Sequence, residues 1–381
     1  MIIRQAKVYS ADHKFRMGDI QITDRRISGT SERIAASDGE EIIEADGLYA
    51  IPGLVDIHEH GAMGCDFCDA DHKAFDTILE YEARHGVLAV CATTMTLPEE
   101  DLGKIADAVA DYETASGADI VGINLEGPFV NGEKLGAQNP DYLALPDAAM
   151  VRRINKRAKG KVRLLDLAPE LEGAMACIAE LKEELVLSIA HTTCSYQTAM
   201  EALAAGASHV THLYNAMPSL HHREPGPIAA GAEAKAYAEL ICDGVHVHPA
   251  MVRLAFALYG AERIAMISDS MRACGLEDGI YDLGGQEVRV SGSRAELVRD
   301  ANTIAGGVTS LFDCMKTAVQ TMGIPLEMAV RAASENPAQS IGVEKDYGSI
   351  APGRYGNIIL CDEELAIQTI IKKGKVIVAK G

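Results

Sequence analysis

The sequence has no long apolar run: none reaches the roughly 18 residues that a membrane-spanning helix needs. Its first residues, MIIRQAKVYS, also lack the apolar core of a secretory signal peptide. Basic residues are few, because 35 lysines and arginines stand against 55 acidic residues, and the formal net charge is -20. We therefore expect no membrane partner and no nucleic-acid partner, although a small anionic substrate can still bind where a pocket is locally positive.

The nine cysteines do not suggest a disulfide framework, since their number is odd and they are scattered along the chain. Cys65 and Cys68 form a single C-x-x-C. A zinc ribbon needs a second pair of this kind, and a redox site needs thioredoxin-like surroundings, so we interpret the two as ordinary small residues. The pattern favours a reducing compartment, and the expected location is cytoplasmic.

The two ends of the chain are rich in short strands. Residues 1–50 alternate polar and apolar residues between Gly and Asp turns, and the tail GSIAPGRYGNIILCDEELAIQTIIKKGKVIV follows the same pattern. We expect both ends to form one small β-sandwich domain, made of residues 1–52 together with residues 346–381.

The middle of the chain alternates apolar runs with helical segments rich in Ala, Glu and Lys. The runs are LYAIPGLVDIHEH, VLAVCATTMT, DIVGINLEGPF, VRLLDLAPE, LVLSIAHTT, HVTHLYNAM, YAELICDGVHV and RIAMISDSM. Strands that alternate with helices form parallel βα units, and eight such units in about 250 residues predict an α/β fold of the TIM-barrel type. The barrel would span residues 53–345, with a hairpin inserted at about 276–303 over its mouth. An open doubly wound sheet is the alternative, but no G-x-G-x-x-G follows the first strand.

Charged and imidazole side chains stand at the ends of these apolar strands. In chain order they are His58, His60, Glu126, Glu170, His191, His212, His246 and Asp269. Barrel enzymes carry their chemistry at the carboxyl ends of the strands, and such groups are costly there unless they pair or bind a ligand. The set predicts a metal site at the barrel mouth, in which we interpret Glu170 as a paired carboxylate rather than a ligand.

His58 and His60, with one residue between them, stand at the end of the first barrel strand. Side chains alternate along a strand, so both face the same side with Cα atoms about 6.6 Å apart and can reach one cation. Imidazoles and carboxylates suit zinc or divalent iron, and these strand ends offer no thiolates of a closed structural zinc site. His209 is expected on the opposite face of its strand from His212, in a structural role. Solvated positions are expected for His13, His72 and His85, while His221, His222 and His248 stay undecided.

Several motifs follow one another in a distinctive order: PGLVDIHEHG, LEGPF, AHTT, THLYNAM, REPG, DGVHV, SDS and TIAGG. With them the chain resembles the N-acetylglucosamine-6-phosphate deacetylases of the amidohydrolase superfamily over nearly its whole length. LEGPF, THLYNAM and REPG are far more specific to those enzymes than the first motif and the ending GSIAPGRYGNIIL, which resemble the superfamily broadly. The resemblance implies hydrolysis of N-acetylglucosamine 6-phosphate to glucosamine 6-phosphate and acetate, in amino-sugar catabolism.

The resemblance also implies roles for single residues. Glu126, His191 and His212 match the family's main metal site. His58 and His60 match the members that hold a second ion, which Glu126 would bridge to the first, whereas other members carry Gln and Asn there and hold one metal. The implied cofactor is thus a divalent metal, zinc or iron, with one or two ions per subunit. Asp269 resembles the catalytic acid–base.

Further matches imply the substrate site and the oligomer. The substrate-binding matches are Ala137, Gln138, Asn215, Ala216, Arg223, His246, Ile304, Ala305 and Gly306. The family's dimers imply a homodimer, in which Arg223 and His246 are the phosphate partners, within one chain or across the interface. One position departs from the family: LGAQNP places Gln138 where a histidine is expected beside the substrate amide. Glutamine can donate a hydrogen bond but cannot carry positive charge. The departure therefore bears on the rate of hydrolysis, or on which acyl group or sugar the substrate carries.

Three other functions compete with this one. N-acetylgalactosamine 6-phosphate is an alternative substrate, because one hydroxyl separates the two sugars. A cyclic amidase of the dihydroorotase type often places a carboxylated lysine on the fourth strand, but VRLLDLAPE contains none. A metal-dependent scaffold without catalysis has no need of Asp269, which is dispensable for holding metal.

Overall fold

Eight parallel strands form the centre of the molecule. The computed structural model describes residues 1–114 and 116–379. The barrel strands are β6 (Leu54–Glu59), β9 (Val87–Thr94), β10 (Asp119–Glu126), β11 (Val162–Leu167), β12 (Val186–Ile189), β13 (His209–Val210), β14 (Tyr237–Ile241) and β15 (Ile264–Ile267). They pair in sequence order, and every pair is parallel. This confirms the predicted α/β barrel and its eight strands.

The first and last strands of this sheet meet and nearly close the barrel. The amide of Asp269 donates to the carbonyl of His58 at 3.0 Å, and the amide of His60 donates to the carbonyl of Ser270 at 2.9 Å. Every residue of β6 and β9 is buried. Strands covered on both faces are apolar without alternation, which is why these runs are readable in the sequence.

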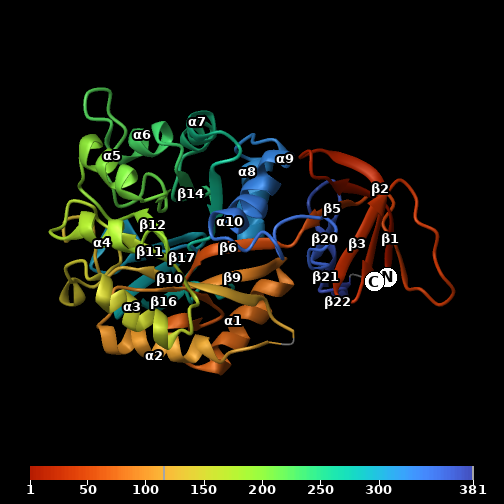
Figure 1. Cartoon of the computed structure of the whole chain (residues 1–381), viewed down its shortest axis with the longest axis horizontal. Helices are drawn as coiled ribbons and strands as arrows, with labels where there is room; N and C mark the ends of the chain where they lie inside the picture. The colour runs from red at the N-terminus through yellow and green to blue at the C-terminus, as the bar shows by residue number, and fades with distance from the viewer. Residues whose placement is uncertain (115, 380–381) are drawn as a thin grey trace.

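Helices surround the barrel (Figure 1). They are α1 (His72–Arg84), α2 (Glu99–Ala110), α3 (Ala148–Arg157), α4 (Ala174–Leu181), α5 (Tyr196–Ala205), α6 (Gly226–Glu233), α7 (Pro249–Tyr259), α8 (Leu311–Gln320), α9 (Leu326–Ala333) and α10 (Glu335–Ser340), with short 3-10 turns η1 (Phe67–Asp69) and η2 (Pro140–Tyr142). Side-chain caps start several of them: Asp71 accepts from the amide of Lys73 before α1, and Ser310 accepts from the amide of Asp313 before α8. Such caps satisfy amides that a helix start leaves unpaired.

Both chain ends join in one further sheet, apart from the barrel in Figure 1. Its strands are β1 (Ile2–Tyr9), β2 (Phe15–Thr23), β3 (Arg26–Ser31), β4 (Ile42–Glu44), β5 (Tyr49–Pro52), β20 (Ile358–Cys361), β21 (Ile367–Lys372) and β22 (Lys375–Ala379). The antiparallel pair β5–β20 connects the two ends. Apolar residues such as Ile20 and Ile358 form a separate cluster here, while Ile51 and Ile370 join the large core that runs through the barrel and its helices. The domain boundaries at residues 52 and 346 stay predictions.

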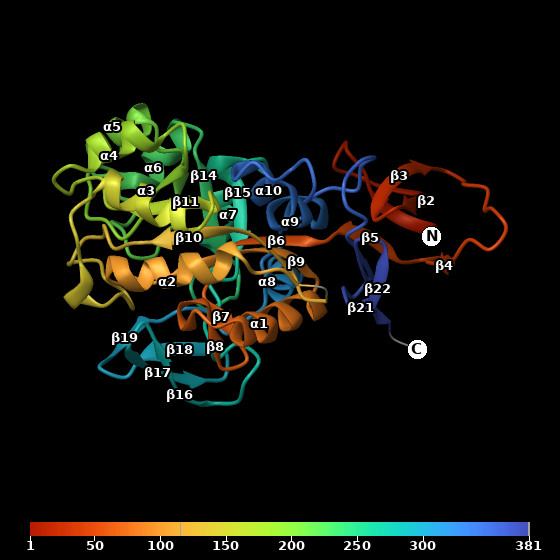
Figure 2. The same ribbon diagram turned by 60° about the horizontal axis from the view of Figure 1, so that its bottom comes forward.

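The insertion before α8 is larger than the predicted hairpin. It is a four-stranded antiparallel sheet of β16 (Gly279–Leu283), β17 (Gln286–Ser291), β18 (Arg294–Leu297) and β19 (Asp300–Ile304), seen in Figure 2 near α1 and the short pair β7 (Gly61–Ala62) and β8 (Cys65–Asp66). Gly284, Gly285 and Gly292 have positive φ angles at two of its turns, a conformation that glycine adopts without steric cost. The insertion therefore contains more strands and turns than the single hairpin that was predicted.

No helix among the residues described is both long and apolar enough to cross a membrane.

Candidate active site

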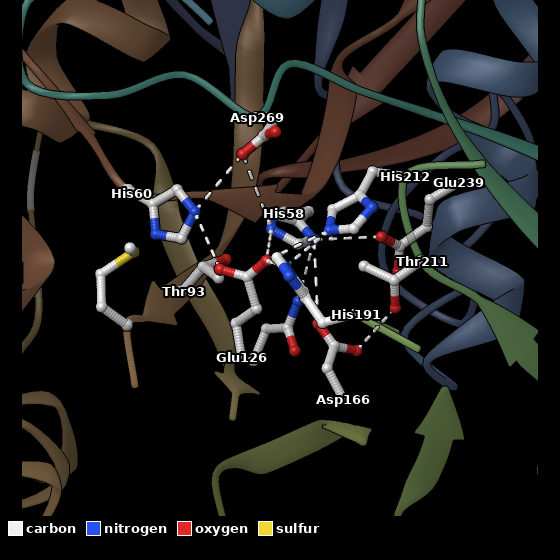
Figure 3. Close-up of polar contacts among 12 residues, drawn as sticks. His58, His60, Thr93, Glu126, Asp166, His191, Thr211, His212, Glu239 and Asp269 are labelled. Carbon is white, nitrogen blue, oxygen red and sulfur yellow. Dashed lines mark hydrogen bonds and ion pairs between the residues drawn. The ribbon is translucent and has the colours of Figure 1, made fainter. Parts of the chain in front are cut away.

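Three of the candidate site residues have the same sequence position relative to the end of their strands. His191, His212 and Asp269 each stand two residues after the last residue of β12, β13 and β15. Their φ angles are positive, at 41°, 27° and 50°, which is uncommon for residues other than glycine. The chain turns at the end of each strand, and the three side chains gather at one place in Figure 3.

His191 and His212, together with His58 and His60, surround Glu126, the last residue of β10 (Figure 3). Glu126 Oε1 lies 3.0 Å from His191 Nε2 and 3.3 Å from His212 Nε2. Its Oε2 lies 3.4 Å from His60 Nε2, while His58 Nε2 is 3.6 Å from Oε1. Among the described residues, two groups have the spacing to hold an ion, and Glu126 belongs to both: it joins His58 and His60 in one, and His191 and His212 in the other.

The donor atoms of these groups fit a divalent metal. His58 Nε2 is buried and has no hydrogen-bond partner, although Glu126 and Asp269 face it. The Nε2 atoms of His191 and His212 face each other at 3.1 Å, an arrangement in which both nitrogens can share one cation. The donors are imidazole nitrogens and carboxylate oxygens, the set that suits zinc, iron or manganese. The residues present therefore fit the predicted metal.

The Glu126 carboxylate is held in its charged form. Burial alone would raise its pKa, but His58, His191 and His212 outweigh burial and hold the pKa of Glu126 well below its ordinary value. Burial acts on Asp269 in the same way, and His60 and His58 likewise lower the pKa of Asp269. Both acids are therefore ionised at neutral pH. Asp269 Oδ1 lies 3.4 Å from His60 Nε2 and 3.7 Å from His58 Nε2, so it borders one of the two groups.

Residues behind the ligands fix their orientation. His58 Nδ1 is 3.0 Å from Glu239 Oε2, and His191 Nδ1 is 2.7 Å from the carbonyl of Lys134. Carboxylate and carbonyl oxygens only accept, so both Nδ1 atoms carry the proton and both Nε2 atoms are free to bind metal. Glu239 and Lys134 were not among the predicted site residues. A glutamate inside the apolar run YAELI was the signal for Glu239, whereas nothing marked a backbone carbonyl.

His209 is buried beside Glu239, with its Nδ1 3.7 Å from Glu239 Oε1. Strand alternation does not relate His209 to His212 as predicted, because β13 ends at Val210 and His212 belongs to the following turn. Glu170 accepts hydrogen bonds from Asn131, Thr192 and Thr193. It belongs to neither ligand group.

A cavity of about 410 Å³ opens above the ligands, and most predicted substrate-binding residues line it. Those that line it are Ala137, Gln138, Asn215, Ala216, His246, Ile304 and Gly306, beside His60, Glu126, His191, His212 and Asp269. Leu283 and Asn302 also line it, so the inserted sheet forms part of its wall. Ala305 is not among the lining residues, because it is fully buried with the core of that sheet.

The structure does not bring Arg223 to this cavity. The side chain is exposed, and its guanidinium contacts His222 at 2.6 Å. His246, in contrast, is held at the cavity wall by Asp243, whose Oδ2 lies 2.7 Å from His246 Nδ1. Burial alone would lower the pKa of His246, but Asp243 raises it above its ordinary value. Lys134 is the one lysine or arginine among the cavity-lining residues that the structure describes.

The other histidines lie outside the ligand groups. His13 bonds to Glu335, His72 and His85 to backbone carbonyls, and His248 caps α7. His221 and His222 are exposed beside Arg223.

Gln138 is buried, and its amide is committed to the site. Its Oε1 accepts from the amide of Thr96 at 2.7 Å, and its Nε2 donates to Glu126 Oε2 at 2.6 Å. The second contact of Nε2 is with the sulfur of Met95 at 3.9 Å. The side chain thus faces a metal-ligand candidate.

Comparisons with known proteins identify the family of the chain. The Amidohydrolase family model matches residues 49–377. The N-acetylglucosamine-6-phosphate deacetylase of Bacillus subtilis is 32% identical over 99% of this chain and 96% of its own length. The N-acetylgalactosamine-6-phosphate deacetylase of Escherichia coli O157:H7 is 33% identical over 96% and 94%. A variant of the Mycobacterium smegmatis N-acetyl-D-glucosamine-6-phosphate deacetylase, solved in complex with N-acetyl-D-glucosamine-6-phosphate, is 31% identical, covers 100% of this chain and 99% of its own, and superposes with a TM-score of 0.92. The chain therefore belongs to the amidohydrolase family, and within it to the N-acetylglucosamine-6-phosphate deacetylases.

Proposed function

We propose that this chain hydrolyses the acetamide of N-acetylglucosamine 6-phosphate, giving glucosamine 6-phosphate and acetate, in amino-sugar catabolism. One observation carries the proposal: Glu126 is shared by two groups with the spacing of metal ligands, and Asp269 faces one of them in the wall of a single cavity. Relatives that cover nearly the whole chain bear this activity in their names.

Five residues would hold the metal: Glu126, His191 and His212 the main ion, and His58 and His60, with Glu126, a second one. The expected metal is zinc or iron, with one or two ions per subunit. When bound, such an ion lowers the pKa of water from 15.7 toward about 7 and polarises the amide carbonyl. The orientation of His58 by Glu239 and of His191 by Lys134 supports this assignment, because each contact engages Nδ1 and leaves Nε2 directed to the ligand group.

Asp269 is the proposed acid–base. It is ionised at neutral pH, so it can accept a proton from the water that attacks the amide carbon. As the bond between the carbonyl carbon and the nitrogen breaks, Asp269 returns that proton to the departing amine. The oxygen of the water ends in acetate, and the amine ends on the sugar.

The phosphate needs local cations in a protein with a net charge of -20. His246 lines the cavity, and Asp243 raises the pKa of His246 above its ordinary value, which favours the charged form. Arg223 is exposed and outside the cavity of its own chain, which favours a homodimer in which it reaches the neighbouring cavity. A guanidinium binds phosphate oxygens with a planar pair of donors. Ala137, Asn215, Ala216, Ile304 and Gly306, which line the cavity, complete the proposed substrate-binding set.

N-acetylgalactosamine 6-phosphate is the second candidate substrate, and the 33% identity to the Escherichia coli enzyme named for it favours keeping it. All nine cysteines are free thiols, which supports the cytoplasmic location that we propose.

The deciding experiment compares three substrates. Metal-loaded protein is incubated with N-acetylglucosamine 6-phosphate, with its galactosamine epimer and with dihydroorotate, and acetate release or ring opening is followed. We expect acetate from the glucosamine compound. Faster release from the galactosamine epimer would make N-acetylgalactosamine 6-phosphate the preferred substrate. The absence of acetate from both sugars would refute the proposal.

A further inference from the structure

The amide of Gln138 has only one orientation that satisfies its surroundings. Gln138 is 1% exposed, so water does not replace its partners. The backbone N–H of Thr96 can only donate, and it points at Gln138 Oε1 at 2.7 Å. The amino group must therefore face the other way, where it donates to Glu126 Oε2 at 2.6 Å. A flipped amide would set two donors against each other and an oxygen against a carboxylate.

The oxygen that Gln138 holds belongs to one side of the carboxylate. Glu126 Oε1 faces His191, His212 and His58, whereas Oε2 faces His60 at 3.4 Å. Gln138 therefore fixes the oxygen that is directed to His60, a ligand candidate of the second ion alone. Oε1 keeps its own contacts with His191 and His212, so its position does not depend on Gln138 alone.

The backbone around Gln138 is anchored from the inserted sheet. Gln286, the first residue of β17, donates through Nε2 to the carbonyls of Ala137 and Gln138, both at 2.9 Å. Gln286 is 8% exposed, and the amide of Gln138 donates to the carbonyl of Leu135 at 2.9 Å. Gln138 is thus held at its side chain and at its backbone, and its contact with Glu126 is pre-organised.

We propose that Gln138 is a positioning residue for the second metal ion: it orients Glu126 Oε2 toward the site formed with His58 and His60, rather than binding the carbonyl of the substrate. The inference deepens the proposed function and rests on it for the presence of metal. Outer partners of metal ligands are worth roughly 10- to 100-fold in metal affinity. Gln138→Met removes the donor and keeps an unbranched side chain of similar length.

The experiment counts zinc rather than product. Wild-type protein, Gln138→Met and the control Gln197→Met are equilibrated with buffered free zinc, and bound ions per chain are measured by elemental analysis. Gln197 is a matched control, because it also donates to a glutamate, Glu201 at 2.9 Å, but on the exposed face of α5. We expect two ions in the wild type and in the control. In Gln138→Met, the weaker ion should dissociate about 10- to 100-fold more readily, and the tighter ion should be unchanged.

The same substitution in a His60→Ala variant distinguishes a positioning role from a general loss of structure at the site. His60→Ala removes a ligand of the second ion, so adding Gln138→Met should not weaken the one ion that remains. Equal weakening of that ion would mean a merely structural role and would overturn the proposal. So would wild-type affinity for both ions in Gln138→Met, or a wild-type chain that holds a single ion. Acetate release is measured separately, so failure of the proposed function leaves the zinc result readable.

Discussion

Asp269→Asn tests the acid–base assignment most directly. Asparagine has the same shape as aspartate but cannot accept a proton at neutral pH. The ligand set of Glu126, His58 and His60 is unaltered, so metal content should stay at the wild-type value. A positioned acid–base contributes about 10²- to 10⁴-fold to a rate, and tenfold corresponds to 1.36 kcal/mol. We therefore expect kcat to fall by 10²- to 10⁴-fold, which is roughly 3–5 kcal/mol, with little change in KM.

The assay follows acetate from N-acetylglucosamine 6-phosphate, with metal counted on the same preparation. Asp243→Asn is the matched control, because Asp243 also stands two residues after a barrel strand but contacts His246 rather than the metal ligands. It should raise KM far more than it lowers kcat. If Asp269→Asn keeps a tenth of the wild-type kcat, or loses kcat only in proportion to lost metal, Asp269 is not the acid–base.

Four further predictions follow from the site and its surroundings. His58→Ala should lower the metal content by about one ion per chain in elemental analysis, and an unchanged content would contradict a second ion. Arg223→Ala should raise KM for the phosphorylated sugar about tenfold or more and leave the unphosphorylated sugar unaffected; equal losses would remove it from phosphate binding. Because Asp243 raises the pKa of His246, KM should increase only above that raised pKa, and Asp243→Asn should move the increase to lower pH in a KM profile from about pH 6 to pH 9. Burial and negative neighbours raise the pKa of Glu82 well above its ordinary value. The folded state therefore keeps a proton that the unfolded chain releases, and the free energy of unfolding falls as pH rises. Glu82→Gln should raise Tm at neutral pH and have little effect near pH 4.

The eight strands were predictable because each is a short apolar run that ends in a polar residue. Burial on both faces removes the alternation that would otherwise identify a face, so the sequence located β12 and β13 but not the direction of each side chain. The turns after these strands decided that direction. His212 reaches Glu126 because β13 stops at Val210, and a strand-alternation argument has no information about where pairing stops.

Contacts between distant segments were not predictable. Glu239 on β14 meets His58 on β6 only because the barrel closes and sets the level of both strands. The position of Gln286 against the carbonyl of Gln138 depends in the same way on how the inserted sheet packs. In contrast, the residues that end strands were predictable, because a charged group at the end of an apolar run is costly without a partner wherever the strand lies.

The left-handed backbone at His191, His212 and Asp269 has a consequence for how the chain can evolve. A side chain in that conformation costs up to about 1–2 kcal/mol per residue, less for His and Asp than for most residue types, and glycine would remove the cost. Folding stability alone therefore does not favour these residues over glycine, whereas the proposed reaction uses their side chains. In a duplicated gene released from catalysis, these positions should drift early, and the resulting protein should be more heat-stable than its active ancestor.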